Sequence, residues 1–155
     1  MSESKKSPAG IDPRGPRVGA AITSVLLLVT VFLALDAATL PAAFALLIAI
    51  TALFLWGAIF GPANHPYGFI FKKLVRPALK APTELEDPRA PQFAQGVGFF
   101  VAAVGLVLYA VGIEGGLVYA AAAAFVAAFL NAVFAFCLGC QIYIGLKRVG
   151  VIRSA

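Results

Sequence analysis

The two cysteines of this 155-residue chain lie in one short motif, Cys137-Leu138-Gly139-Cys140. Residues at positions i and i+3 share a helix face, so the two sulfurs can approach bonding distance after modest adjustment. This C-x-x-C spacing is typical of dithiol redox pairs, and it is also half of a four-cysteine metal site. Cys137 and Cys140 are therefore the candidate catalytic residues, as a redox pair; packing inside a membrane helix is the alternative.

The position of the pair within its helix determines how reactive it can be. If one helix runs through this region, both cysteines lie toward its C-terminal end, where the helix dipole disfavours a thiolate. Arg148 would then be the compensating cation, because it falls on the same helical stripe. An interruption of the helix at Gly139 would remove this handicap. We expect Cys140 to be the more accessible thiol, because it lies one turn nearer the aqueous side.

Other chemistry finds little support. A metal bound by the cysteines would need further ligands, and His65 and seven acidic residues are the other candidates within the chain, although two copies could supply four thiolates. The phosphate-binding G-x-x-x-x-G-K-[ST], zinc-protease H-E-x-x-H and hydrolase G-x-S-x-G patterns are absent. We therefore expect no cofactor and no bound metal, and we interpret His65 as an ordinary loop residue.

The composition predicts an integral membrane protein. Hydrophobic residues make up 61% of the chain and charged residues 12%, whereas soluble domains have roughly 45–50% and 25%. So few charges could not cover so much apolar mass in water. The net charge of +5 is explained by basic segments that flank apolar spans, and nothing in the sequence indicates a nucleic-acid partner.

Four apolar stretches are long enough to cross a bilayer as helices, which takes about 20 residues each. They lie at about 18–35, 41–60, 93–113 and 117–136, and the last apolar pattern extends to 146. We predict an all-α integral membrane fold with four transmembrane helices as two hairpins. A single membrane domain covers 11–148, with a disordered cytoplasmic tail at 1–10 and a cytoplasmic tail at 149–155. Residues 18–60 and 93–136 show no convincing sequence repeat.

The charges predict the orientation. All twelve Lys and Arg residues lie before the first span, in the central segment or after the last span. The only charged residues in the two short turns on the other side are Asp36 and Glu114. By the positive-inside rule, both termini and the central loop face the cytoplasm. Cleavage of residues 1–38 as a signal peptide is the less favoured alternative.

The central loop at 61–92 contains a basic amphipathic pattern. Four cations share one side of a helical wheel and are the predicted membrane-surface residues: Lys72, Lys73, Arg76 and Lys80. We expect this segment to be an interfacial helix on the inner leaflet, ended or kinked by Pro77. The acidic cluster at 84–87 is interpreted as a solvated loop; a docking site for a basic partner is the alternative.

Asn131 is the one strongly polar residue deep in the fourth span. On a continuous helix it lies about 180° from Cys140 and shares its stripe with several alanines. Small residues with one amide allow membrane helices to pack closely, so we assign Asn131 to helix packing. A contact with substrate is the alternative.

Several motifs are jointly specific, and they extend over about residues 10–148. They are Ile11-Asp12-Pro13-Arg14-Gly15-Pro16-Arg17, His65-Pro66-Tyr67-Gly68, Arg76-Pro77, Glu84-Leu85-Glu86-Asp87-Pro88, Gln92-Phe93-Ala94-Gln95, Phe129-Leu130-Asn131-Ala132 and Phe136-Cys137-Leu138-Gly139-Cys140. On these residues the chain resembles the domain of unknown function family 4395, small bacterial membrane proteins. The resemblance implies a multi-pass protein of the bacterial cytoplasmic membrane in which the cysteine pair belongs to the family pattern. It also implies a cytoplasmic thioredoxin-like or sulfurtransferase-like partner.

Three functional hypotheses follow. The first is a membrane thiol–disulfide or sulfur-handling component that uses Cys137 and Cys140 with a cytoplasmic thiol partner. The second is a non-catalytic membrane subunit or anchor in which the cysteines only pack. The third is a small transporter for a sulfur compound, built as a homo-oligomer because four spans enclose little space alone. Whether the pair cycles between dithiol and disulfide discriminates the first two.

Overall fold

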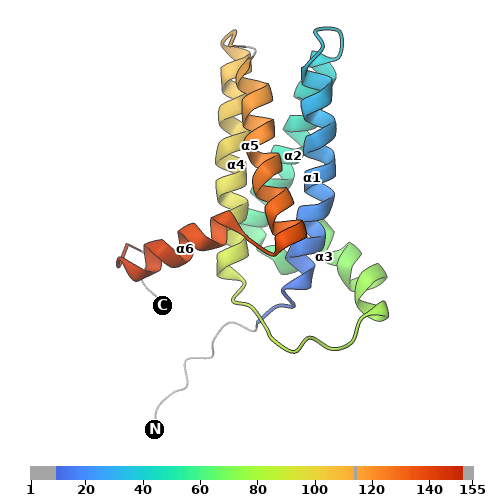
Figure 1. Cartoon of the computed structure of the whole chain (residues 1–155), viewed down its shortest axis with the longest axis vertical. Helices are drawn as coiled ribbons and strands as arrows, with labels where there is room; N and C mark the ends of the chain where they lie inside the picture. Colours follow the sequence, from blue (N-terminus) through green and yellow to red (C-terminus); the bar gives the residue numbers. More distant parts are fainter. Residues whose placement is uncertain (1–9, 114, 152–155) are drawn as a thin grey trace.

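Four long helices form an upright bundle (Figure 1). They are α1 (Arg14–Ala34), α2 (Leu40–Phe60), α4 (Arg89–Ala110) and α5 (Gly115–Phe134). The computed structural model describes residues 10–113 and 115–151; Glu114, most of the predicted tail at 1–10 and the end of the predicted tail at 149–155 lie outside them. All four helices are long and apolar enough to cross a membrane. The all-α membrane fold with four such helices is therefore confirmed.

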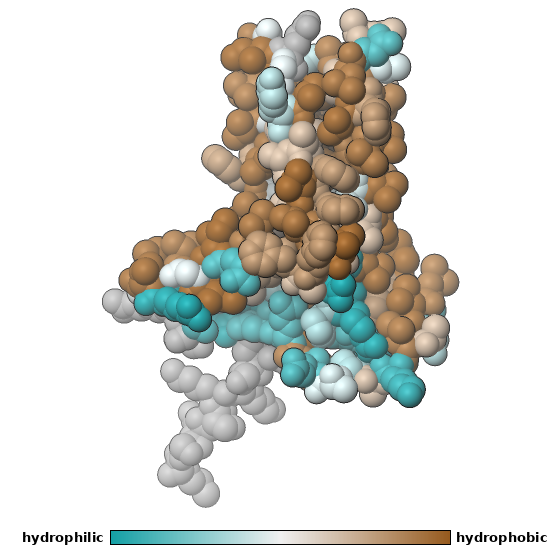
Figure 2. All heavy atoms as spheres, in the orientation of Figure 1, coloured by the Kyte–Doolittle hydropathy of each residue, from teal (hydrophilic) through white to brown (hydrophobic). Residues whose placement is uncertain are grey.

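The surface of the bundle fits a lipid environment. Large apolar side chains are exposed along its outer faces, among them Phe32, Trp56, Phe100 and Val126. Figure 2 shows hydrophobic residues over the upright helices and hydrophilic residues gathered near the end that carries α3 and α6. Because exposed apolar side chains of this extent are stable in hydrocarbon, the bundle contacts the lipid bilayer.

The core lies between the four helices. The largest side chains with almost no exposure are Leu27, Leu47, Ile50 and Leu117. Thr51, which is also buried, donates its hydroxyl to Leu47 O at 2.6 Å within its own helix, so no polar group is left unsatisfied there. Between the two halves of the chain, α1 packs against α5, and α2 packs against α4.

Each half of the chain, α1 with α2 and α4 with α5, is followed by a shorter helical segment at the polar end of the bundle. After α2, helical turns follow one another as α3 (Pro66–Ile70), η2 (Phe71–Val75) and η3 (Arg76–Ala78). Phe71 is buried, while Lys72 and Lys73 are exposed. After α5, α6 (Leu138–Arg148) turns away from the bundle axis (Figure 1).

The fourth span does not continue to residue 146 as one helix, as the apolar pattern suggested. α5 ends at Phe134, Ala135 adopts a positive φ of 55°, and a new helix begins at Leu138. A straight helix over 117–146 would be about 45 Å long, whereas the hydrocarbon core is about 30 Å thick. The surplus residues turn sideways instead, and α6 buries Gly139, Cys140 and Tyr143.

The starts of the two halves are built alike. Asp12-Pro13-Arg14 begins α1, and Asp87-Pro88-Arg89 begins α4. In each, the aspartate accepts the backbone N–H of the arginine, at 3.0 Å in the first and 2.9 Å in the second, and also pairs with its guanidinium. The residues just before them, Ile11 and Glu86, exchange two backbone hydrogen bonds in antiparallel fashion.

The likeness continues along the helices. Arg17 donates to Ala132 O at 3.2 Å, in the last turn of α5, and Gln92 donates to Ala58 O at 2.9 Å, in the last turn of α2. Arg17 follows Arg14 by the same spacing at which Gln92 follows Arg89. The packing of α1 on α5 therefore has its counterpart in the packing of α4 on α2. The two halves, each with two long helices and a shorter helical segment, thus share the same order of elements and matching contacts between their long helices.

Candidate functional site

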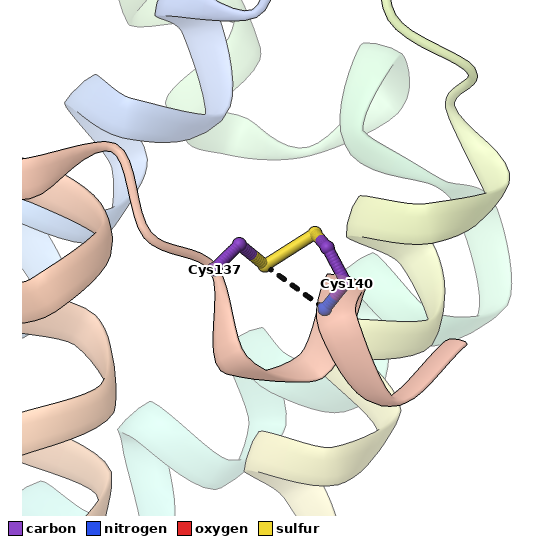
Figure 3. Close-up of a disulfide and its surroundings, with 2 residues drawn as sticks. All are labelled: Cys137 and Cys140. Atoms are coloured by element: carbon purple, nitrogen blue, oxygen red, sulfur yellow. Dashed lines mark hydrogen bonds between the residues drawn. A yellow bond between two sulfur atoms is a disulfide. The ribbon is translucent and has the colours of Figure 1, made fainter. Parts of the chain in front are cut away.

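The cysteine motif forms the first turn of α6. Cys137 precedes the helix with extended backbone angles (φ −88°, ψ 106°), and its Sγ accepts the backbone N–H of Cys140 at 3.2 Å. Figure 3 shows this contact together with the bond between the two sulfurs. The Cα atoms are 5.1 Å apart, and the pair is a disulfide in this structure. The expectation that the two sulfurs can bond is thus met.

This geometry reverses the electrostatic expectation for the pair. The cysteines lie at the N-terminus of α6, whose unpaired N–H groups and helix dipole favour a negative sulfur. The predicted stripe that joins both cysteines to Arg148 is wrong, because Cys137 lies outside the helix and Arg148 ends it. Because the helix is interrupted between α5 and α6, the cysteines do not lie at a helix C-terminus, and no cation is needed to compensate for one.

The two cysteines differ in access. Cys137 is partly exposed, whereas Cys140 is 6% exposed and packs in an apolar cluster with Ala90 and Tyr143. Our expectation that Cys140 would be the more accessible thiol is therefore wrong. The reason is the turn of the chain after α5, which places the face of α6 bearing Cys140 against α4 instead of toward the aqueous side.

Gly139 allows this close docking. A Cβ atom added at Gly139 would lie 2.5 Å from the Cα and Cβ of Ala94 on α4, which is closer than real Cβ contacts. A glycine between the two cysteines is thus required by the packing of α6 on α4. The counterpart contact in the first half joins Gly19 of α1 to Tyr67 of α3, with the glycine now on the long helix.

A cavity of about 580 Å³ lies beside the disulfide, between α1, α4, α5 and the start of α6. Both cysteines line it. Most of its wall is apolar, and the polar groups in the helical part of the wall are Arg17, Thr23, Gln95 and Asn131. Glu84 and Glu86 of the central loop line the end of the cavity that leads to the polar surface. Sequence patterns could not predict this cavity, because its walls come from segments that are far apart in the chain.

Small side chains on α5 leave the space open. Ala124, Ala127 and Ala128 line the cavity, and the corresponding stretch of α2 carries Ile50, Leu53 and Phe54. The two halves therefore differ in side-chain bulk at matched positions. The alanine stripe, interpreted from sequence as a packing surface, faces the cavity along part of its length.

Asn131 lies on this wall rather than on a face remote from the cysteines. The helical wheel separated it from Cys140 because it assumed one continuous helix, and the break after Phe134 invalidates that angle. Asn131 is half-buried and shares the cavity with both cysteines. Its assignment to helix packing stays a prediction.

In the first half, His65 takes the place of Cys137. It precedes α3 with extended angles, and its Nδ1 accepts the backbone N–H of Tyr67 at 3.1 Å. Its Nε2 lies 2.9 Å from Leu53 O, which requires the proton on Nε2. Burial lowers the pKa of His65, which is 3% exposed. Both ring nitrogens are satisfied, so His65 is a structural cap and not a free ligand.

The pKa values of the acidic groups near the cavity are shifted in different directions. The guanidinium of Arg14 holds the pKa of the buried Asp12 below its ordinary value. Burial and the neighbouring charge of Asp87 raise the pKa of Glu86. Burial also acts on Asp87, but its hydrogen bonds to Arg89 outweigh it and lower the pKa of that carboxyl. The two aspartates thus anchor the helix starts, whereas Glu86 lines the cavity wall.

The predicted membrane-surface cations belong to the other half of the chain, where three lie in the helical turns η2 and η3 and Lys80 follows them. Lys72, Lys73, Arg76 and Lys80 are exposed, and Lys72 Nζ donates to Ala63 O at 3.3 Å. Their contact with lipid headgroups stays a prediction. Within residues 10–113 and 115–151, no group of three or more His, Cys, Asp or Glu side chains is placed to hold a metal ion.

Comparison with known proteins supplies a family without an activity. No curated protein and no solved structure matches the chain. Residues 11–148 match a family described as "Domain of unknown function (DUF4395)", and the match spans every described helix. The chain therefore belongs to the DUF4395 family, as its motifs indicated.

Proposed function

We propose that the protein is a membrane thiol–disulfide component that exchanges two electrons with a dithiol protein of the thioredoxin type. The observation that carries the proposal is the position of Cys137 before α6, with its Sγ accepting the N–H of Cys140 on the wall of a cavity. A helix N-terminus favours thiolates, which are the attacking and leaving groups of disulfide exchange.

The exchange can be written with its atoms balanced. A thiolate of the partner attacks Cys137 Sγ, the more accessible sulfur, and the bond to Cys140 breaks with its electron pair on Cys140. The second partner thiol then attacks the partner's own bonded sulfur and releases Cys137 as a thiolate. The partner leaves as a disulfide, and the protein keeps two electrons and two protons as its dithiol. The reverse sequence oxidises the protein and reduces the partner.

The orientation is part of the proposal. All Lys and Arg residues among those described lie at the end of the bundle that carries the cysteine pair or in the segments leading to it. The positive-inside rule then favours a cytoplasmic location for both termini, in the cytoplasmic membrane of a bacterium. A cytoplasmic partner, thioredoxin-like or sulfurtransferase-like, could reach Cys137 from that side. One chain supplies the complete pair, so the exchange needs no second copy.

The alternative of a non-catalytic subunit rests on Cys140. Its burial against Ala90 and Tyr143 is what a packing residue would show. Packing does not account for the partial exposure of Cys137 or for the cavity beside it. A resolving cysteine is commonly the more buried of a pair, so the burial of Cys140 is also consistent with exchange.

The test uses a thioredoxin whose second cysteine is replaced by serine, so that thioredoxin cannot complete the exchange, and acid quenching stops the freed Cys140 thiol from reversing the mixed disulfide. Added to inside-out membrane vesicles that contain the oxidised full-length protein, it should form a covalent adduct through Cys137, identified by mass spectrometry. Right-side-out vesicles should give none, because Cys137 then faces the lumen. The Cys137→Ser and Cys140→Ser variants, which lack the disulfide, are the controls.

Absence of an adduct in both kinds of vesicle, while the same thioredoxin reacts with a small-molecule disulfide, would contradict the proposal. An adduct in right-side-out vesicles alone would keep the exchange chemistry but place the partner on the opposite side.

A further inference from the structure

We propose that the cavity beside Cys137 and Cys140 binds the ring of a lipid-soluble quinone, which oxidises the reduced pair. The inference rests on the proposed function, because it names the second reactant of the same cysteine pair. The thioredoxin-type partner would reach the pair from the polar surface, and the quinone would reach it from the membrane.

The cavity has the size and character of a small-molecule site. Such sites measure roughly 300–1,000 Å³ and combine apolar walls with a few polar groups. This one measures about 580 Å³, and Phe54, Val97, Val101 and the alanines of α5 form its apolar walls. A quinone is a flat ring with apolar substituents and two carbonyl acceptors, so it suits walls of this kind.

Hydrogen-bond donors for the two carbonyl groups lie on the same walls. Arg17 Nε is buried and has no hydrogen-bond partner among the described residues, although an Nη of the same side chain donates to Ala132 O. The amides of Gln95 and Asn131 also line the cavity. A buried N–H without a partner is costly, and a carbonyl oxygen of a bound ring would satisfy it.

The depth of the cavity favours a membrane-dissolved occupant. It extends from Glu86 and the disulfide to Val101 on α4 and Ala123 on α5. Val101 lies about 18 Å along α4 from Arg89, at the helical rise, and so well inside the hydrocarbon layer. Glu84 and Glu86 at the polar end disfavour anionic sulfur compounds by their charge.

The electrons and protons balance in this step. The Cys137 thiolate adds to a ring carbon of the quinone. Cys140, after losing its proton, attacks Cys137 Sγ; the sulfur–carbon bond breaks, and its electron pair returns to the ring. The products are the Cys137–Cys140 disulfide and the hydroquinone, whose two oxygens take up the two protons that the thiols have lost. The helix N-terminus favours the thiolate that begins the step.

The experiment uses the full chain in lipid nanodiscs, reduced and then freed of reductant without oxygen. The probe is a ubiquinone analogue with a ten-carbon tail. Its reduction is followed by absorbance, and disulfide formation is followed by the mass added by a maleimide. We expect about one hydroquinone per chain from the wild type and none above background from Cys137→Ser.

A cavity-filling variant and a matched control separate the cavity from the exchange chemistry. Ala127→Leu, or Ala128→Leu if the first does not fold, fills the cavity and should slow quinone reduction at least tenfold. Ala122→Leu is the matched control, because it lies on the face of α5 that carries the exposed Tyr119, Val126 and Phe129. All of these variants should exchange with thioredoxin at the wild-type rate.

Two results would overturn the quinone inference. One is a wild type that exchanges with thioredoxin but reduces the probe no faster than Cys137→Ser. The other is a cavity-filling variant that reduces the probe at the rate of Ala122→Leu. A third result separates the two proposals. If the wild type reduces the quinone but does not exchange with thioredoxin, and the cavity-filling variant no longer reduces the quinone, the quinone inference is supported and the proposed partner is contradicted.

Discussion

At the residue scale, the reactivity of the pair depends on which end of a helix holds it. Cys137 caps α6 and accepts a backbone N–H, while Cys140 lies one turn inside and is buried. The two cysteines therefore have different tasks in the proposed exchange. Cys137 attacks and leaves, and Cys140 resolves the mixed disulfide.

The first prediction concerns this difference in the reduced protein. Cys137 should react with iodoacetamide at a pH at which an ordinary exposed thiol is largely unreactive, because the N-terminus of α6 stabilises its thiolate. Cys140 should react at least tenfold more slowly, because it is buried. The measurement is the pH dependence of alkylation, read by mass spectrometry on the Cys140→Ser and Cys137→Ser variants. Equal rates for the two thiols would contradict the assignment of roles.

The second prediction uses two glycines of the same helix. Gly139→Ala should destabilise the protein by about 1–3 kcal/mol, since its methyl group meets the backbone of α4. Gly145→Ala should be stabilising by about 0.5–1 kcal/mol, because nothing lies within 4 Å of its added Cβ and alanine favours the helix. Thermal unfolding in detergent measures both. Destabilisation of similar size in the two variants would argue against the docking of α6 on α4.

At the element scale, each half of the chain ends in a capped short helix. His65 caps α3 and Cys137 caps α6, each by accepting a backbone N–H through its side chain. A residue with positive φ follows the second long helix of each half, Gly61 after α2 and Ala135 after α5. The same local design thus ends in a histidine in one half and in a redox-capable thiol in the other.

The third prediction concerns the pH dependence of the His65 cap. Burial lowers its pKa in the folded state, so the unfolded chain binds a proton more readily below about pH 6.5. The stabilising contribution of neutral His65 is complete above that pH and is lost as the pH falls below it. Thermal unfolding in detergent between pH 8 and pH 5 should show this fall. The His65→Asn variant keeps a capping oxygen but does not titrate, and its unfolding temperature should vary less; an unchanged slope would contradict the prediction.

The fourth prediction concerns the basic segment after α3. Replacing Lys72, Lys73, Arg76 and Lys80 by glutamate should weaken the binding of this segment to anionic lipid. The expected loss is about 1 kcal/mol for each positive charge that is lost near the surface. Proteinase K should then cleave the segment faster in vesicles with anionic lipid. The control exchanges Lys and Arg at the same positions and keeps the charge. Equal cleavage of both variants would show that these cations do not hold the segment on the membrane.

Sequence patterns predicted the long elements well and the site poorly, for physical reasons. A transmembrane helix is specified by composition over about 20 residues, so the four helices follow from the sequence alone. The break at Ala135 depends instead on the limit of bilayer thickness and on the contact of Gly139 with Ala94, which joins residues far apart in the chain. That break determines the helix end at which Cys137 lies and the cavity that Asn131 faces.

At the scale of the whole molecule, the two halves share their helix contacts but differ in the side chains beside them. Arg17 and Gln92 make matching contacts across the two halves, but the cavity-lining alanines of α5 correspond to the bulkier Ile50, Leu53 and Phe54 of α2. The repeat escapes sequence comparison because matched positions differ in residue type, and Asp-Pro-Arg at each helix start is the clearest surviving signal. The second half of the chain carries the cysteine pair, and residues of both halves line the cavity beside it.

The measurement that tests the central claim most directly is the redox state of Cys137 and Cys140 in living cells. Acid quenching followed by maleimide labelling separates the dithiol from the disulfide by mass. The account predicts that both forms are present, that a pulse of reductant or oxidant shifts their ratio, and that the ratio returns within minutes after the pulse. A pair that remains wholly in one form before and after each pulse, in a protein that is folded in the membrane, would contradict the claim that it is a working dithiol.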